Sequence, residues 1–172
     1  AGEYRNSILG QLYDGMFNNR VRERMQQPNP PVIYGGGGDF LWMGQKQTYQ
    51  LSAQAKENSI REGLDYLLAE ANRVKQHGFT PSELDRQKKE QFRWIERLYK
   101  ERDKTESGNY ADEYIRHFLT NEPIPGIEVE YNLIKQFLPE ITLEEINKLA
   151  EVRMVPGNRV VVVSAPEKEG VK

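Results

Sequence analysis

The two histidines of the sequence are the residues best suited to metal chemistry, and their spacing argues against it. His77 and His117 lie forty positions apart. Helical zinc peptidases place two histidines and a glutamate within one or two turns, so that all three reach the metal or its water. Neither His-x-x-Glu-His nor His-Glu-x-x-His occurs in the 172 residues, and there is no cysteine. We therefore predict no metal ligands and no catalytic residues in this chain.

Each histidine also has an ordinary structural explanation. His77 precedes Gly78 in the last turn of an expected helix, where the helix dipole favours a cation. Glu113 lies one helical turn before His117 and could share a metal with it, but such a pair lacks two further ligands. No Ser-His-Asp set can be argued from the spacing either.

A run of four glycines at positions 35–38 is the second feature that could do chemistry. Glycines let backbone amides approach a phosphate closely, but a phosphate loop continues into Gly-Lys-Ser/Thr and a helix. Here the acidic, strand-like segment 39–42 follows instead. A bulge or an exposed strand edge is therefore favoured, and such an edge could accept an extended peptide by strand addition.

Three arginines, Arg20, Arg22 and Arg24, stand in the last turns of the first expected helix. They could hold a carboxylate, and Tyr34 on the following strand could form a hydrogen bond with a substrate. The alternative is a solvated helix end whose positive charge complements the helix dipole, beside an ordinary half-buried tyrosine.

The hydrophobic pattern predicts helices and strands that are not interleaved one by one. Apolar residues at helical spacing predict a first helix from Tyr4 to Met25. From Val32 we expect two short strands or one strand broken by a bulge, and the alternation after Gly44 predicts a half-buried antiparallel strand. Several helices follow in succession. Capping boxes begin at Ser59, Thr80 and Thr142.

The sequence returns to a strand-like pattern at residues 160–163, which are four consecutive valines. This run has no polar face, so it predicts a central strand that is covered on both sides or buried at its edges. Strands followed by consecutive helices indicate an α+β fold, with an antiparallel or mixed sheet and helices packed against it. We expect one domain over residues 1–166, a loose tail at 167–172, and a longer parent polypeptide whose strands precede the first helix.

Composition excludes several classes of protein. The 24 basic and 26 acidic residues give a net charge of −2, and a nucleic-acid partner usually requires a clustered basic face. No apolar stretch approaches the ~20 residues that span a bilayer. We therefore expect no nucleic acid and no membrane span. The absence of cysteine leaves both a periplasmic and a cytoplasmic location in a bacterium open.

The order of several short segments resembles the insulinase/pitrilysin type of zinc peptidase, the inverted-motif family whose relatives include mitochondrial processing peptidase. The resemblance covers nearly the whole chain. Its carriers are the helix end at residues 18–24, the small-residue strand after Tyr34, and the segments 78–86, 122–128, 138–147 and 158–163.

Proteins of this type are built from similar α+β domains with the LuxS/processing-peptidase-like fold, and the first domain carries His-x-x-Glu-His for zinc. Because this chain lacks the motif, the resemblance implies the second, non-zinc domain of the catalytic half, truncated at its N-terminus. Its implied role is to help enclose the chamber in which peptides bind extended. Zinc is expected in the preceding domain of the parent zinc metalloendopeptidase, the partners are its other domains and a peptide or protein substrate, and the chain alone should be inactive.

The resemblance also suggests which residues touch the substrate. In another domain of such proteins, an arginine at the end of the corresponding helix and a tyrosine on the next strand contact the substrate near the zinc. Arg24 and Tyr34 fall in similar places, although the proline-rich segment 28–31 lengthens the gap. With Gly35 and Gly36 they are the candidate substrate contacts. Two alternatives remain: an inactive assembly or partner subunit of the same fold, and a peptide-binding module that uses an exposed strand edge.

Overall fold

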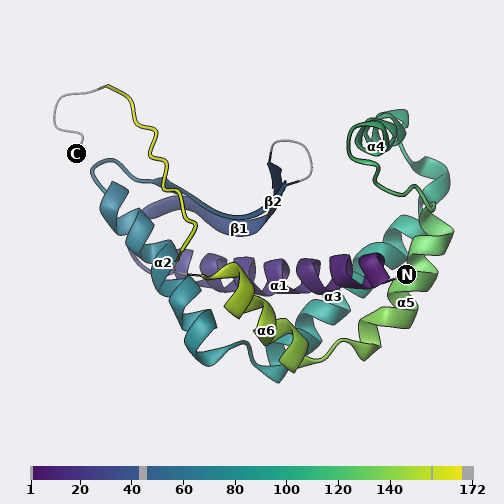
Figure 1. The fold of residues 1–172 in the computed structure, drawn as a ribbon, viewed down its shortest axis with the longest axis horizontal. Coiled ribbons are helices and arrows are strands. Elements are labelled where there is room, and N and C mark those ends of the chain that lie inside the picture. Colours follow the sequence, from purple (N-terminus) through teal and green to yellow (C-terminus); the bar gives the residue numbers. More distant parts are fainter. Residues whose placement is uncertain (1, 43–45, 156, 168–172) are drawn as a thin grey trace.

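The computed structural model describes residues 2–42, 46–155 and 157–167, and Figure 1 shows its elements. Met43, which follows the strand-like segment 39–42, and residues 168–172 of the predicted tail lie outside this part. The expected α+β fold is confirmed as an antiparallel hairpin with helices packed against it. In chain order the elements are α1 (Gly2–Met25), β1 (Val32–Trp42), β2 (Lys46–Ala55), α2 (Ile60–His77), α3 (Pro81–Lys100), the 3₁₀ turn η1 (Arg102–Lys104), α4 (Ser107–Thr120), α5 (Ile127–Glu140) and α6 (Leu143–Arg153).

The predicted first helix forms the centre of the molecule. Figure 1 shows the hairpin lying across one side of α1, while other helices pack around the rest of it. Its apolar residues recur at helical spacing and are buried at Ile8, Leu12, Tyr13, Met16, Phe17 and Val21. Contact with α2, α3, α5 and α6 as well as β1 places α1 in the core. Burial of this apolar stripe contributes most of the free energy that stabilises the helix.

The hairpin is one continuous pair of antiparallel strands. Gly35 pairs with Ala53 and Gly37 with Leu51, so the glycine run lies inside β1. The register irregularity falls earlier, between Val32 and Tyr34. The predicted alternation of β2 is confirmed, because inward-facing positions such as Leu51 are half-buried and their neighbours are exposed.

Two of the three predicted capping boxes are confirmed. The hydroxyls of Thr80 and Thr142 each accept a hydrogen bond from the backbone N–H three residues later, and the carboxylate of the glutamate there accepts one from the backbone N–H of the cap residue. The predicted box at Ser59 is wrong. Ser59 has ψ of 29° and makes no capping bond with its side chain, because an N-cap needs extended backbone to aim its oxygen at the first turn.

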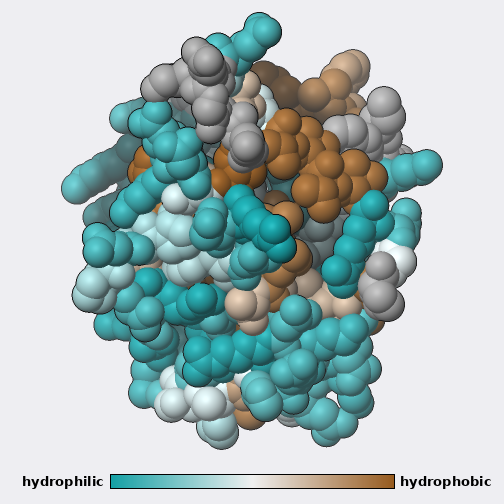
Figure 2. All heavy atoms as spheres, turned by 90° about the vertical axis from the view of Figure 1, so that its left-hand side faces the viewer, coloured by the Kyte–Doolittle hydropathy of each residue, from teal (hydrophilic) through white to brown (hydrophobic). Residues whose placement is uncertain are grey.

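The central strand predicted for residues 160–163 is not present. The four valines are 59–87% exposed and form no strand with the hairpin. Figure 2 shows apolar surface gathered on the side of the molecule along which this segment runs. Valine favours extended backbone, but a strand is stable only when a neighbouring strand satisfies its N–H and C=O groups. No helix among the described residues is long and apolar enough to cross a membrane.

Candidate functional site

The glycines of β1 are explained first by how closely this strand approaches the helices beneath it. A Cβ atom on Gly35 would lie 3.3 Å from Cγ1 of Val21 on α1 and 3.4 Å from Cδ2 of Leu67 on α2. On Gly37 it would lie 3.1 Å from Cε1 of Phe17 on α1 and 2.6 Å from Cδ2 of Leu51 on β2. The inner face of the run therefore serves packing, because only glycine leaves room for this approach.

The outer edge of β1 is partly occupied by a side chain of α1. Asn18 donates from Nδ2 to the carbonyl oxygen of Gly37 at 2.9 Å, and its Oδ1 accepts from the N–H of Gly37 at 2.8 Å. The amide thus imitates one residue of a neighbouring strand. Because bonding directions repeat every second residue, Gly35 and Asp39 direct their backbone groups to the same edge. A peptide that paired along this edge would have to displace Asn18 or bind beside it.

Tyr34 and Gly36 differ in exposure, because Gly36 is buried whereas Tyr34 is exposed. Tyr34 is 61% exposed. Its hydroxyl would lie 3.6 Å from a Cβ atom on Gly36, and Asn18 Oδ1 would lie 2.7 Å from it, so a side chain at this position would collide with the Asn18 clamp.

Arg24 turns toward α2. Its Nη1 donates to the backbone carbonyl of Tyr66 at 3.0 Å, and its guanidinium carbon lies 4.3 Å from the centre of the Tyr66 ring. Glu70 Oε2 is 3.5 Å from the same nitrogen. The structure therefore ties Arg24 to the frame of the molecule, and within the described residues no contact joins it to Tyr34.

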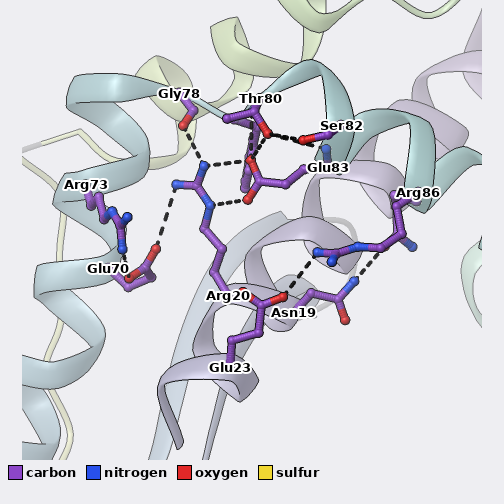
Figure 3. A network of polar contacts seen from close by, with 12 residues as sticks. Asn19, Arg20, Glu23, Glu70, Arg73, Gly78, Thr80, Ser82, Glu83 and Arg86 are labelled. Atoms are coloured by element: carbon purple, nitrogen blue, oxygen red, sulfur yellow. Dashed lines mark hydrogen bonds and ion pairs between the residues drawn. The ribbon is translucent and has the colours of Figure 1, made fainter. Parts of the chain in front are cut away.

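A network of charged side chains surrounds the end of α1 and includes Glu70, a carboxylate that is almost completely buried (Figure 3). Glu70 is 1% exposed and lies within 3.9 Å of three arginines, Arg20, Arg24 and Arg73. Arg20 also donates to both carboxylate oxygens of Glu83, at 2.5 and 2.8 Å. Of the three arginines that the sequence singled out, Arg20 and Arg24 pair with carboxylates of the chain itself, and Arg22 donates to the side chain of Asn19.

Arg20 fixes the junction between α2 and α3. Besides its pair with Glu83 it donates to the carbonyl oxygen of Gly78 at 2.9 Å and lies over the ring of Phe79. Gly78 ends α2 with φ of +66°, a conformation that favours glycine. At the sharp turn between the two helices, the arginine therefore donates a hydrogen bond to a carbonyl and neutralises a carboxylate.

The pKa of Glu83 reports this arrangement. Burial by itself would raise it, but hydrogen bonds from Arg20 and from Thr80 outweigh the burial and lower the pKa to about 2. The same hydrogen bond raises the pKa of Arg20. A shallow cavity of about 280 Å³ lies over the network, between Arg24, Arg73 and Glu83. Glu70 Oε1 is buried without a hydrogen-bond partner among the described residues, and its charge is offset by Arg20 at 3.8 Å, an arrangement that structural ion-pair networks share.

Sequence reasoning missed a second buried cluster, around Arg153 of α6. This side chain is 8% exposed, bonds Asp14 at 2.7 Å and also pairs with Asp39 of β1. Its guanidinium carbon lies 4.5 Å from the centre of the Tyr13 ring and 4.6 Å from that of Tyr49. The cluster ties the far half of β1 to α1 and α6. No local signal identified it, because Arg153 lies more than a hundred positions from every other member.

The described residues do not fit a zinc site. No group of three or more potential ligands is found among them. His77 ends α2 as an exposed residue, and His117 on α4 donates from Nδ1 to the backbone carbonyl of Glu122 at 2.6 Å. The pairing of Glu113 with His117 around a metal thus gains no further ligand from the fold.

Known proteins were compared with the chain, and no protein-family model matches it. A zinc protease PQQL-like protein of Arabidopsis thaliana is 40% identical over 79 residues, which is 46% of this chain and 8% of that protein. Probable zinc protease PqqL of Escherichia coli is 26% identical over 141 residues, 81% of this chain and 15% of that protein. The chain is therefore similar to parts of two zinc proteases and spans 15% or less of the length of either, which supports the resemblance to the insulinase/pitrilysin type of zinc peptidase.

Solved structures agree with this fold. The first half of the periplasmic protease PqqL from Escherichia coli superposes with a TM-score of 0.78 at 20% identity, over 87% of this chain and 32% of that chain. A predicted insulinase family protease from Yersinia pestis gives 0.74 at 12% identity, again over 87% and 32%. The chain therefore shares its fold with about a third of each of these solved chains.

Proposed function

We propose that the chain is the non-zinc domain of a zinc metalloendopeptidase, in which it helps to enclose a chamber that binds peptides in extended form. The observation that carries this proposal is the match of 87% of the chain to part of the solved first half of a protease, in a sequence without either zinc motif. In this proposal zinc and the catalytic groups belong to another domain of the parent. Isolated, the chain has no peptidase activity.

The β-hairpin is the part of the domain that we assign to the chamber wall. Its inner face is packed against α1 and α2, whereas on its outer edge, which Asn18 bonds at Gly37, Asp39 is exposed and Gly35 is half-buried. An extended substrate can bond to such an edge through its own backbone, which gives affinity without demanding a particular sequence. Tyr34 adds one hydroxyl for orientation. Arg24 acts indirectly, by holding α1 against α2 beneath the strand.

The test compares this chain with its full-length parent. Zinc content and endopeptidase activity are measured on both, with and without a chelator. We expect zinc and chelator-sensitive cleavage in the parent and neither in the chain. A parent without zinc or activity would favour an inactive assembly subunit, and stoichiometric zinc in the chain would refute the assignment as the non-zinc domain.

The strand is tested separately in the parent. Replacing Tyr34 with phenylalanine should raise KM by about tenfold with little change in kcat, because one hydrogen bond to the bound substrate is lost. Arg24→Ala should lower stability before it alters kinetics, and Arg22→Ala, at an exposed neighbour, is the control. Unchanged kinetics in the variant that combines Arg24→Ala and Tyr34→Phe would end the assignment of these residues to the substrate site.

A further inference from the structure

Residues of α3 and α5 line a separate apolar groove. Figure 1 shows these two helices on the side of α1 away from the hairpin. The volume of the groove is about 520 Å³. The floor is formed by Phe92 of α3 and by Ile134, Leu138 and Pro139 of α5. This size and apolar lining are typical of sites that accept small amphiphilic molecules.

The rim of the groove is entirely cationic. Two of its four basic side chains already have partners: Lys88 donates from Nζ to the carbonyl oxygens of Pro139 at 3.1 Å and Ile141 at 2.6 Å, and Lys89 pairs with Asp85 at 2.7 Å. Lys88 thereby closes the end of α5, where unpaired carbonyls would otherwise face the groove.

The other two rim cations are Arg93 on α3 and Lys135 on α5. Both are exposed, and neither forms an ion pair with any residue that the structure describes. Arg93 uses only its Nε, which donates to the carbonyl oxygen of Lys89 at 3.2 Å. Two unpaired positive charges on opposite helices thus flank an apolar floor, and no acidic side chain lines the groove.

We propose that this groove binds a single-chain amphiphile with one carboxylate, such as a fatty acid. The alkyl chain lies on the floor formed by Phe92, Ile134 and Leu138, and the carboxylate lies between Arg93 and Lys135. Charge complementarity selects the anion, since guanidinium and ammonium groups both donate hydrogen bonds to a carboxylate. Burial of the alkyl chain supplies the affinity. The site is distinct from the hairpin and does not depend on the peptidase assignment.

The probe is radiolabelled dodecanoate, measured by equilibrium dialysis against the chain and against the full-length parent at low ionic strength. We expect saturable binding at one site in both proteins. Decanoate should bind about tenfold more weakly, because two fewer methylenes are buried. Dodecanol, which has the same chain and no charge, should also bind about tenfold more weakly, because it forms no pair with the rim.

Two double variants distinguish binding by the rim cations from an effect of the protein's net charge. The variant with Arg93→Gln and Lys135→Gln should lose about tenfold in dodecanoate affinity and keep its weak affinity for dodecanol. The control combines Lys100→Gln with Lys148→Gln, which removes the same charge from exposed ion pairs outside the groove. These four side chains are exposed, so all variants should fold.

Three results would overturn the proposal. Dodecanol binding as tightly as dodecanoate would mean that the groove is only an apolar surface. Equal loss in the rim variant and the control would mean that net charge attracts the ligand. Binding to the chain but not to the parent would mean that another segment of the parent covers the groove.

Discussion

Replacing Glu83 with glutamine isolates the charge in the ion pair at the α2–α3 junction. The side chains of Glu83 and Arg20 are 16% and 12% exposed, so water screens this pair only in part. The cap of α3 should survive, because glutamine also accepts the N-cap hydrogen bond at the third helical position. What the substitution removes is the interaction of a carboxylate with the Arg20 guanidinium.

The lowered pKa of Glu83 gives the magnitude. A pKa of about 2 in the folded protein, against the ordinary value of 4.5, corresponds to roughly 3 kcal/mol of stabilisation. Partial solvent screening reduces the expected loss in the free energy of unfolding to about 2 kcal/mol at pH 7. Because the folded-state pKa is the lower one, this stabilisation is present above about pH 5 and is lost as the pH falls from 4.5 towards 2.

The assay is urea denaturation of the chain, followed by circular dichroism at several pH values between 7 and 2.5. The difference in unfolding free energy between the wild type and Glu83→Gln should be about 2 kcal/mol at pH 7 and should shrink steadily below pH 4.5. Asp85→Asn is the control, because its pair with Lys89 is more than 60% exposed and should be worth less than about 0.5 kcal/mol. A difference that stays constant with pH, or that does not exceed the control, would refute the reasoning.

Two other places in the fold give sharp expectations. Gly37→Ala should cost about 1 to 3 kcal/mol in urea denaturation, because its Cβ atom would lie 2.6 Å from Leu51, whereas Gly108→Ala, with nothing within 4 Å, should cost nothing. Asp14 should titrate near pH 6 by carbon NMR, since burial raises its pKa more than Arg153 lowers it, and its contribution to stability should fall as the pH rises through 6. Arg153→Met should raise this midpoint further and destabilise the chain by about 3 kcal/mol; a midpoint below 4.5 in the wild type would contradict the burial of Asp14.

Most helices and the second strand were predictable because their signals are local. The apolar spacing of α1, the boxes at Thr80 and Thr142, and the glycine after α2 each act within a few residues. The order of short segments also indicated a resemblance to zinc peptidases, and the similarity to two zinc proteases supports it. The prediction of a capping box at Ser59 was wrong because the sequence pattern does not determine the backbone angles that capping requires.

The candidate site was predictable only in part. The sequence drew attention to Arg24, Tyr34 and the glycines, and the role of these residues toward a substrate stays a prediction. Their surroundings came from the fold. Asn18 reaches the strand edge from a helix, and Arg24 bonds a carbonyl 42 positions away. Such contacts depend on which elements meet, which no local pattern encodes.

Sequence alone determined where most elements begin and end, that the fold is α+β, and that neither zinc motif is present. The tertiary structure decided which charges are buried together: Glu70 among three arginines, and Arg153 between two aspartates and two tyrosine rings. It also decided whether the four valines are buried. Their hydrophobicity predicted a central strand, but they are exposed. Helix periodicity and capping are satisfied within a few residues, whereas strand pairing and buried ion pairs need partners that only the folded arrangement brings together.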